Sequence, residues 1–484
     1  MFPDIVKRQC TYEGCGEEAL KTSKERLCIL HDKSESKDRD EFQRALHKKL
    51  SNQDYDFRGY CFAGKCSFHG FTFPKDADFR EAQFRGDADF EEARFSGKAT
   101  FKGATFSGRA LFLGAKFSKE GKAEFRNTQF LGDALFSGAE FSGDTLFWQT
   151  RFSADAVFWH AKFSGQTLFL DAIFAEEQRA DFRDAKFSEK VDFSGADFSG
   201  DALFWRAKFS GEALFHGTRF SEEGKADFQE ARFSKNALFQ GAKFSGDALF
   251  GGAAFSGVPD FESSRFFGEI NFGTTDVGTL HLAESNIDTV DLTNAKWSRD
   301  FKNVYEKRAK DVETFRKAEE IYRKVKMSYH RTGDYNLGAM FYYREMECRR
   351  KQIRFRSLNI ISKVFKSLGY DFIRLYCGYG EKPLRVIGFS LAAIVVCAVL
   401  FMKSGIYDEQ GLRLIQYDIS QTWLEILRDF WTCFYYSVIT FTTVGYGDIS
   451  PATGLARTIA MAEGFFGAFS IALFVLTFGR RMMR

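Results

Sequence analysis

The sequence predicts a multidomain protein in which a long all-β rod of square coils is followed by α-helices. Phenylalanines recur every five or six residues from Phe57 to Phe272, and this spacing fits neither the helical period of 3.6 nor the strand period of two. From residue 301 onward, apolar residues recur at helical i, i+3, i+4 spacing instead. Two apolar stretches, residues 386–402 and 455–478, are about long enough to cross a membrane.

Composition and charge limit which partners and which location we expect for the protein. The chain has 68 Lys and Arg against 65 Asp and Glu, a formal net charge of +3, so its charge balance suggests no nucleic-acid partner. The first ten residues lack an apolar signal-peptide core, and we expect the N-terminal part to stay in the cytoplasm. Nine cysteines in a long cytoplasmic chain favour metal binding or packing over a disulfide framework.

Residues 1–50 are predicted to form a small zinc-binding module. Its candidate ligands follow the pattern C-x4-C-x12-C-x2-H and are Cys10, Cys15, Cys28 and His31. This spacing allows a closed, structural Cys3His site, and the metal would supply the folding energy that a short polar segment lacks. The segment resembles a zinc-ribbon-like module found at the start of some bacterial proteins. The alternative is four unrelated residues in a disordered tail.

The phenylalanine ladder predicts the rod. A small residue stands two positions before most phenylalanines, as Ala77 does before Phe79, and three steps are stretched to eight residues. A five-residue step fits one side of a square coil, with the large side chain inward and extra residues bulging at corners. Beyond Phe272 the inward positions continue in steps of five as Val277, Leu282, Ile287, Leu292 and Trp297. At four inward positions per coil, the whole ladder gives about eleven coils.

The ladder resembles the pentapeptide-repeat family, which implies a right-handed quadrilateral β-helix over residues 57–297. Acidic and basic residues are interleaved along it, which argues against mimicry of DNA. No catalytic constellation occurs in the ladder, so we predict no enzymatic activity. The rod is compatible with a sensor, a scaffold or a docking surface.

The next segment is predicted to be helical. Residues 301–331 form one expected helix, Gly333 and Asp334 break it, and residues 337–350 form the second helix of a hairpin spanning 301–352. The hairpin weakly resembles a single tetratricopeptide unit. Residues 356–382 interleave basic side chains with apolar ones, which indicates a basic helix at the cytoplasmic membrane surface. The alternative is a solvated charged helix.

Residues 384–484 are predicted to form a pore domain. Between the two long apolar stretches lies a short aromatic helix, residues 427–441, followed by Thr442, Thr443, Val444, Gly445, Tyr446, Gly447 and Asp448. The two glycines of this run adopt positive φ at little cost, which lets successive carbonyls turn to the same side.

This order of outer helix, pore helix, filter and inner helix resembles the bacterial two-transmembrane-helix potassium channels. The resemblance implies a filter for K⁺ at residues 442–448, K⁺ as the transported ion and a homotetramer in a lipid membrane. Tyr435 and Tyr436 match the aromatic pair that braces the filter in that family. Ile439 stands where many bacterial channels have a carboxylate, so their slow inactivation does not carry over.

Two residues of the inner helix are candidates for gating. Gly467 lies nineteen residues after Asp448, where the resembled channels carry a hinge glycine, and Glu463 is a carboxylate on a membrane helix. The alternative for Glu463 is a hydrogen bond to the back of the pore helix. Basic flanks predict a two-pass protein of the cell (inner) membrane with both termini in the cytoplasm, and a gate near residues 476–481.

Two rival functions remain open. The first is a membrane-anchored scaffold with a vestigial pore, which the intact T-V-G-Y-G run disfavours. The second is a non-selective cation channel, which Tyr446 and both filter glycines disfavour. Neither a voltage-sensor arginine series nor a nucleotide-binding glycine fingerprint occurs in the sequence, so no regulatory ligand or partner is assigned.

Overall fold

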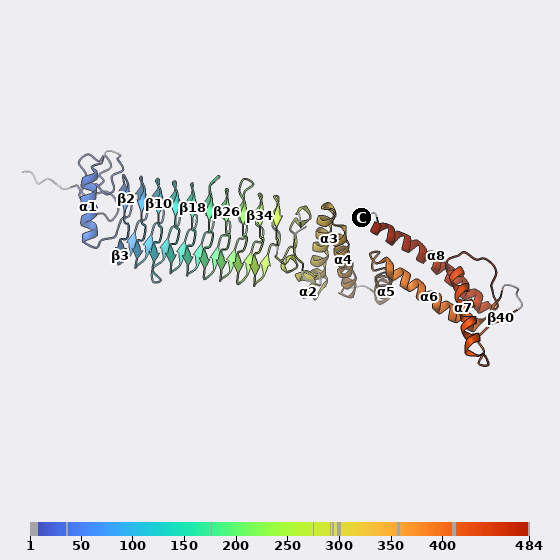
Figure 1. Ribbon diagram of the computed structural model, residues 1–484. Helices are drawn as coiled ribbons and strands as arrows, with labels where there is room; N and C mark the ends of the chain where they lie inside the picture. The colour runs from blue at the N-terminus through green and yellow to red at the C-terminus, as the bar shows by residue number, and fades with distance from the viewer. Residues whose placement is uncertain are drawn as a thin grey trace, which may run out of the picture. The chain divides into compact units, whose positions relative to one another are not determined.

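The computed structural model of the protein describes residues 8–34, 37–175, 177–273, 275–290, 292, 295–297, 302–355, 359–408 and 413–482. The chain divides into two compact units, coloured from blue to red along the sequence in Figure 1. Unit 1 comprises Met1–Ala309 and Glu320–Asp334, and unit 2 comprises Lys310–Glu319 and Tyr335–Arg484.

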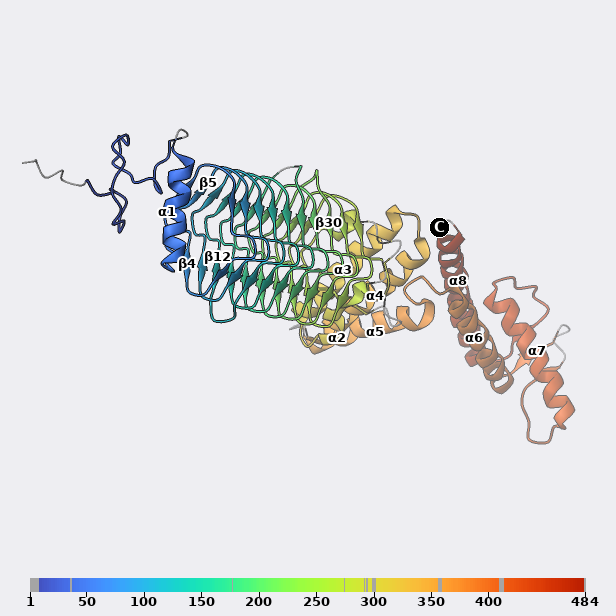
Figure 2. The ribbon, with the colours of Figure 1, turned by 60° about the vertical axis from the view of Figure 1, so that its left-hand side comes forward.

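Unit 1 contains a parallel β-solenoid, which confirms the fold class predicted from the phenylalanine spacing. Two-residue strands run from β1 (Cys61–Phe62) to β38 (Ile270–Asn271) and form four parallel sheets of ten, ten, nine and nine strands. Each strand pairs with the strands four before and four after it, so each coil has four sides. β1 pairs with β5 (Gln83–Phe84), for example, which places Phe62 opposite Phe84. Figure 2 shows the coils stacked along the rod.

Phenylalanine columns fill the solenoid. Phe79 stacks on Phe101 of the next coil, with ring centroids 4.8 Å apart and planes 2° from parallel. The same ring meets Phe90 edge-on, at 5.5 Å and 87°. Both geometries are favourable for aromatic pairs, contributing roughly 0.5–1.5 kcal/mol beyond burial. Stability is therefore built coil on coil, as in other repeat proteins.

The extra residue of each longer step lies at a corner, as expected. Between Phe84 and Phe90 the corner contains Gly86, and a Cβ added to Gly108 one coil later would lie 2.6 Å from the Gly86 carbonyl carbon. Asp87 Oδ1 accepts a hydrogen bond of 3.0 Å from the Arg109 N–H of that next coil. Glycine is thus required by close backbone approach, and the carboxylate joins neighbouring coils.

A helix covers the N-terminal end of the solenoid. Helix α1 (Arg39–Ser51) buries Phe42 and Leu46, and the Phe42 ring meets Phe62 edge-on at 5.5 Å. Cys66 is buried in β2 (Cys66–Ser67). Covering the first coil removes an open sheet edge that would otherwise invite pairing with other chains.

The C-terminal end of the solenoid differs in detail from the sequence prediction. Strands stop after β38, so ten strands stack in the longest sheets where we expected about eleven coils. The inward positions continue as the 3-10 helices η1 (Val277–Thr279) and η2 (Ile287–Thr289), in which Val277 and Ile287 are buried. The later part of helix α3 (Val312–Arg331) contacts this end, where the Tyr329 hydroxyl donates to the Leu292 carbonyl at 2.9 Å.

The single helix predicted over residues 301–331 is wrong. The chain forms α2 (Val304–Arg308) and then α3, separated by residues 309–311; Phe301 lies outside the described residues. Asp311 interrupts the helix because its carboxylate accepts a hydrogen bond of 2.8 Å from the Thr314 N–H, a bond that lowers the pKa of Asp311. This contact caps the new helix.

Unit 2 begins with a helical hairpin and the basic helix. The early part of α3 packs on α4 (Tyr335–Phe355) through Phe315 and Phe355, whose ring centroids are 5.7 Å apart. Helix α5 (Ile360–Cys377) follows and exposes an apolar face, with Ile360 80 % and Phe365 73 % exposed. Arg356, where this segment was predicted to begin, lies outside the described residues.

The remaining helices form the predicted membrane part. Helices α6 (Pro383–Ser404) and α8 (Gly454–Met482) are long and apolar enough to cross a membrane. The shorter α7 (Trp423–Phe441) contacts both of them. A small antiparallel sheet of β39 (Ile406–Tyr407), β40 (Leu414–Ile415) and β41 (Ser450–Pro451) joins the loops at one end.

Candidate functional site

The run from Thr442 to Asp448 is attached to the C-terminal end of α7 by its own backbone. The Val444 N–H donates to the Ile439 carbonyl at 3.0 Å, and the Gly445 N–H approaches the same oxygen at 3.4 Å. These bonds satisfy carbonyls that a helix end normally leaves without partners. The negative end of the α7 dipole also lies where the run begins, a position that favours cations.

Alternate residues of the run adopt positive φ. Gly445 and Gly447 do so at 54° and 82°, as the sequence predicted, and Thr443 does so at 58°. A positive φ is a genuine outlier for a β-branched residue, and such strain persists only where the surroundings impose it. Sequence reasoning missed this feature of Thr443. Its hydroxyl donates to the Thr442 carbonyl at 2.7 Å.

A tyrosine of α7 binds the far end of the run. The Tyr435 hydroxyl donates to Asp448 Oδ2 at 2.8 Å, so the first of the two predicted aromatic residues contacts the filter segment directly. Tyr436 is buried instead against Phe401 of α6, with ring centroids 4.8 Å apart. Tyr435 thus holds the run at Asp448, and the Ile439 carbonyl holds it at Val444.

Glu463 lies behind α7, as the alternative interpretation expected. Its carboxylate contacts the Ser437 hydroxyl, which also donates to the Ile394 carbonyl of α6 at 2.9 Å. The Glu463 side chain is only 3 % exposed. Ser437 had not been singled out in the sequence, yet it joins the outer, pore and inner helices at one point.

Gly467 lies where α8 crosses the end of α7. A Cβ at this position would lie 1.9 Å from the Phe441 carbonyl oxygen, so only glycine permits this approach. The contact supports a packing role for Gly467. Of the segment predicted to form the gate, Leu476 is exposed on α8, whereas the Arg481 side chain lies outside the described residues.

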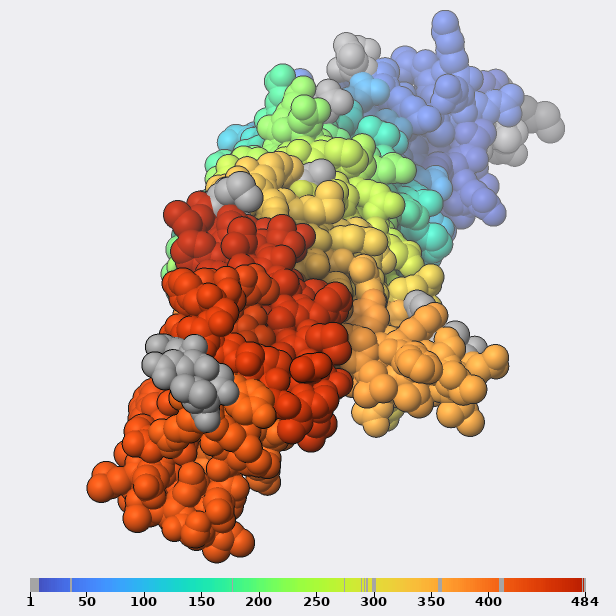
Figure 3. Space-filling view, turned by 90° about the vertical axis from the view of Figure 1, so that its right-hand side faces the viewer, coloured from blue at the N-terminus to red at the C-terminus, as the bar shows by residue number. Residues whose placement is uncertain are grey.

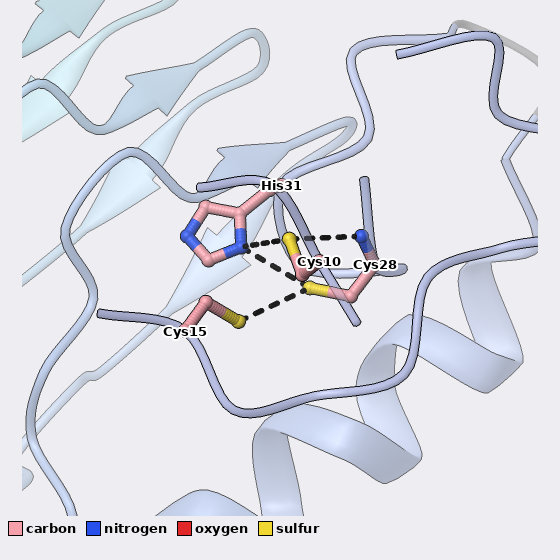
Figure 4. Close-up of side chains that lie close together, drawn as sticks. All are labelled: Cys10, Cys15, Cys28 and His31. Carbon is pink, nitrogen blue, oxygen red and sulfur yellow. Dashed lines mark hydrogen bonds between the residues drawn. The ribbon is translucent and has the colours of Figure 1, made fainter. Parts of the chain in front are cut away.

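The four predicted metal ligands converge in unit 1 (Figure 4). Nδ1 of His31 lies 3.1 Å from Cys28 Sγ and 3.6 Å from Cys10 Sγ, and the sulfurs of Cys15 and Cys28 are 3.8 Å apart. A tetrahedral zinc site with Zn–S bonds of about 2.3 Å places its ligand atoms roughly 3.5–3.8 Å apart. The donor set and the separations of 3.6 and 3.8 Å therefore fit zinc, whereas Nδ1 and Cys28 Sγ lie closer than they would around the ion.

The surroundings of His31 fit the same site. Its Nε2 lies 2.9 Å from the Arg58 carbonyl; because a carbonyl can only accept, Nε2 carries the hydrogen and the Nδ1 lone pair faces the sulfurs. Burial lowers the pKa of His31, which favours the neutral, metal-binding ring. Arg58 belongs to the first coil, so a metal here would tie this segment to the rod.

Comparison with protein families agrees with both parts of the structure. Residues 386–484 match the family model described as ion channel. The model of pentapeptide repeats matches residues 68–116, 125–173, 158–208, 177–219 and 204–254. The chain therefore combines pentapeptide repeats with an ion-channel domain, and together with its two apolar helices this domain marks it as a membrane protein.

Curated relatives resemble only part of the chain. A potassium channel of Plasmodium berghei is 31 % identical over 101 residues, which are 21 % of this chain and 7 % of that protein. A putative potassium channel protein of Rhodopseudomonas palustris is 26 % identical over 90 residues, 19 % of this chain and 21 % of the relative. The chain thus spans a small part of both relatives. No solved structure matches it.

Proposed function

We propose that the protein is a potassium-selective channel through which K⁺ passes passively. The observation that carries this proposal is the backbone from Thr442 to Asp448. The N–H groups of Val444 and Gly445 are directed at the end of α7, and positive φ at alternate positions allows successive carbonyls to turn to the same side. A row of such carbonyls replaces the hydration shell of K⁺.

The pore requires several copies of the chain, and we propose a homotetramer. One chain supplies one filter strand, whereas the known filters of this sequence are built from four. The apolar side chain of Val444 and the aromatic side chain of Tyr446 are 53 % and 73 % exposed in the single chain. Neighbouring subunits would cover these side chains, and lipid would cover the outer apolar surfaces of α6 and α8.

The orientation follows from charge. Basic residues precede α6 and stand in the last turn of α8, and an excess of positive charge marks the cytoplasmic side. We therefore place both termini in the cytoplasm and the filter at the outer side of a cell (inner) membrane. The solenoid would then be a cytoplasmic element that biases the gate or binds a partner.

We further propose that Cys10, Cys15, Cys28 and His31 hold a structural zinc ion. All four ligands would come from the protein, which leaves no open position for catalysis. The Cys28 N–H also donates a hydrogen bond to Cys10 Sγ at 3.3 Å, which holds these two candidate ligands close together. The ion would stabilise the loops that precede α1.

Potassium flux from liposomes tests the channel proposal. Vesicles loaded with K⁺ and carrying the full-length protein should lose K⁺ rapidly once an ionophore compensates the charge. Vesicles carrying Gly445→Ala provide the control, because a Cβ opposes the φ of 54° at that position. Protein that inserts in vesicles but releases no K⁺ would favour a membrane-anchored scaffold instead.

A further inference from the structure

A pocket of about 300 Å³ lies within unit 2, where α5 and the turn after it meet α8. Its apolar walls come from Phe372, Ile373 and Tyr376 of α5 and from Phe469 and Leu473 of α8. This volume is at the lower end of the roughly 300–1,000 Å³ typical of small-molecule sites. A slender apolar ligand, such as part of one acyl chain, matches a cavity of this size and lining.

One cation stands at the edge of this pocket. Arg480 lines it near the turn, with Nη1 3.3 Å from where a Cβ on Gly380 would be. Other cations near the turn are engaged: Arg374 faces Glu347 at 3.4 Å, and Arg385 donates to the Arg374 carbonyl at 3.0 Å. Within the described part of the chain, no carboxylate pairs with Arg480. An anion at the mouth of the pocket would therefore find an available partner.

The turn that bounds the pocket is held in one shape. Gly378, Tyr379 and Gly380 all have positive φ, which is costly for tyrosine. The Tyr379 hydroxyl donates to Glu347 at 2.8 Å. Burial would raise the pKa of Glu347, but hydrogen bonds from Arg350 and Tyr379 outweigh it and lower that pKa, so the carboxylate stays charged and keeps the turn anchored.

The surface next to the pocket fits a membrane. Helix α5 projects from the side of its unit, in orange in Figure 3, and exposes Ile361, Val364 and Leu368. A helix with an exposed apolar face and basic residues lies in the plane of a lipid interface. The same helix lines the pocket, so lipid bound at α5 would lie next to it.

We propose that this pocket binds an anionic phospholipid, with part of one acyl chain between α5 and α8 and the phosphate on Arg480. The apolar walls disfavour a free inorganic anion, and the unpaired guanidinium disfavours a purely apolar occupant. Basic pockets beside membrane helices on the cytoplasmic side are suited to such headgroups. This site lies apart from the filter and is tested without measuring ion flux, so it can fail independently of the channel proposal.

The test uses full-length protein stripped of lipid in detergent and titrated with phosphatidylglycerol or phosphatidylcholine bearing the same oleoyl chains. Native mass spectrometry counts the lipids bound per chain. We expect one saturable phosphatidylglycerol per chain and about fivefold weaker binding of phosphatidylcholine, as for one headgroup contact with a basic side chain. Arg480→Gln should abolish that preference, while Arg457→Gln, at the exposed start of α8, should keep it.

A second pair of variants tests the apolar walls. Ile373→Trp should fill the pocket and remove binding of both lipids, whereas Ile361→Trp on the same helix, outside the pocket, should keep the saturable site. Equal affinity of the wild type for the two lipids, or wild-type binding by Arg480→Gln and Ile373→Trp, would overturn the proposal. So would displacement of phosphatidylglycerol by millimolar inorganic phosphate, or a wild type that binds no lipid because a second copy of the chain fills the pocket.

Discussion

The Tyr435 hydroxyl lies 2.8 Å from Asp448 Oδ2 and joins α7 to the last residue of the run Thr442–Asp448. Near the start of the run, the Ile439 carbonyl accepts a hydrogen bond from the Val444 N–H. Val444 to Asp448 belong to no helix or strand. Their shape therefore depends on α7, and each contact can be tested separately.

Tyr435→Phe should weaken the hold on the filter. The substitution removes one hydrogen bond, worth about 1 kcal/mol, and leaves one Asp448 oxygen without its donor. We expect smaller K⁺ currents that run down faster in planar bilayers. Tyr417→Phe is a suitable control because this tyrosine is exposed and its hydroxyl makes no contact with the filter. Currents of wild-type size and duration from Tyr435→Phe would argue against a bracing role.

Gly467→Ala should destabilise the packing of α8 on α7. The added Cβ would lie 1.9 Å from the Phe441 carbonyl oxygen, and such overpacking typically costs about 1–3 kcal/mol. The melting temperature of the detergent-solubilised protein should fall. Gly479→Ala, on the same helix with open space around its Cβ position, should leave it unchanged or raise it slightly. Equal melting temperatures of the two variants would show that the close approach at Gly467 does not contribute to stability.

The metal site predicts a stoichiometry. Elemental analysis of purified protein should find about one zinc per chain, and Cys28→Ser should lose it. Cys66→Ser, which changes a buried cysteine of the solenoid instead, should retain the metal. Chelation should expose Cys10 and Cys28 to thiol reagents. Metal-free protein whose cysteines react freely while the rod stays folded would contradict the assignment.

The solenoid is predicted to bias gating and not to form the pore. Deleting residues 1–297 should leave a K⁺-selective channel with altered open probability in single-channel recordings. A flexible Gly/Ser insertion after Arg356, a residue outside the described part of the chain, should act similarly, because a slack linker transmits little force. Indistinguishable gating of both variants and the wild type would make the rod a docking platform.

The sequence predicted the solenoid well because its pattern is both regular and physically restrictive. Phe79, Phe90 and Phe101 are placed by a step that no helix or ordinary strand accommodates, and glycines such as Gly108 mark corners where backbones touch. The ends were harder to predict. The spacing of apolar residues does not indicate that the strands are replaced by 3-10 helices after β38, or that α1 covers the first coil.

In the helical part of the chain, the features that the sequence did not predict depend on single side chains or on contacts between distant residues. The break before α3 depends on one side chain, Asp311, within an otherwise helical apolar pattern. The run Thr442–Asp448 could be singled out from its residue types, and the four candidate metal ligands from their spacing. The contact of Ser437 with Glu463 joins residues 26 positions apart, and the strain at Thr443 arises from the end of α7; neither has a sequence signal.

Ion selectivity tests the central claim most directly. With K⁺ on one side of a bilayer and an equal concentration of Na⁺ on the other, the current through the full-length protein should reverse far from zero voltage, on the side that shows K⁺ to be the permeant ion. Gly445→Ala should carry no K⁺-selective current. A wild-type reversal potential near zero, showing equal permeability to both ions, would contradict the assignment of Thr442 to Asp448 as a potassium filter.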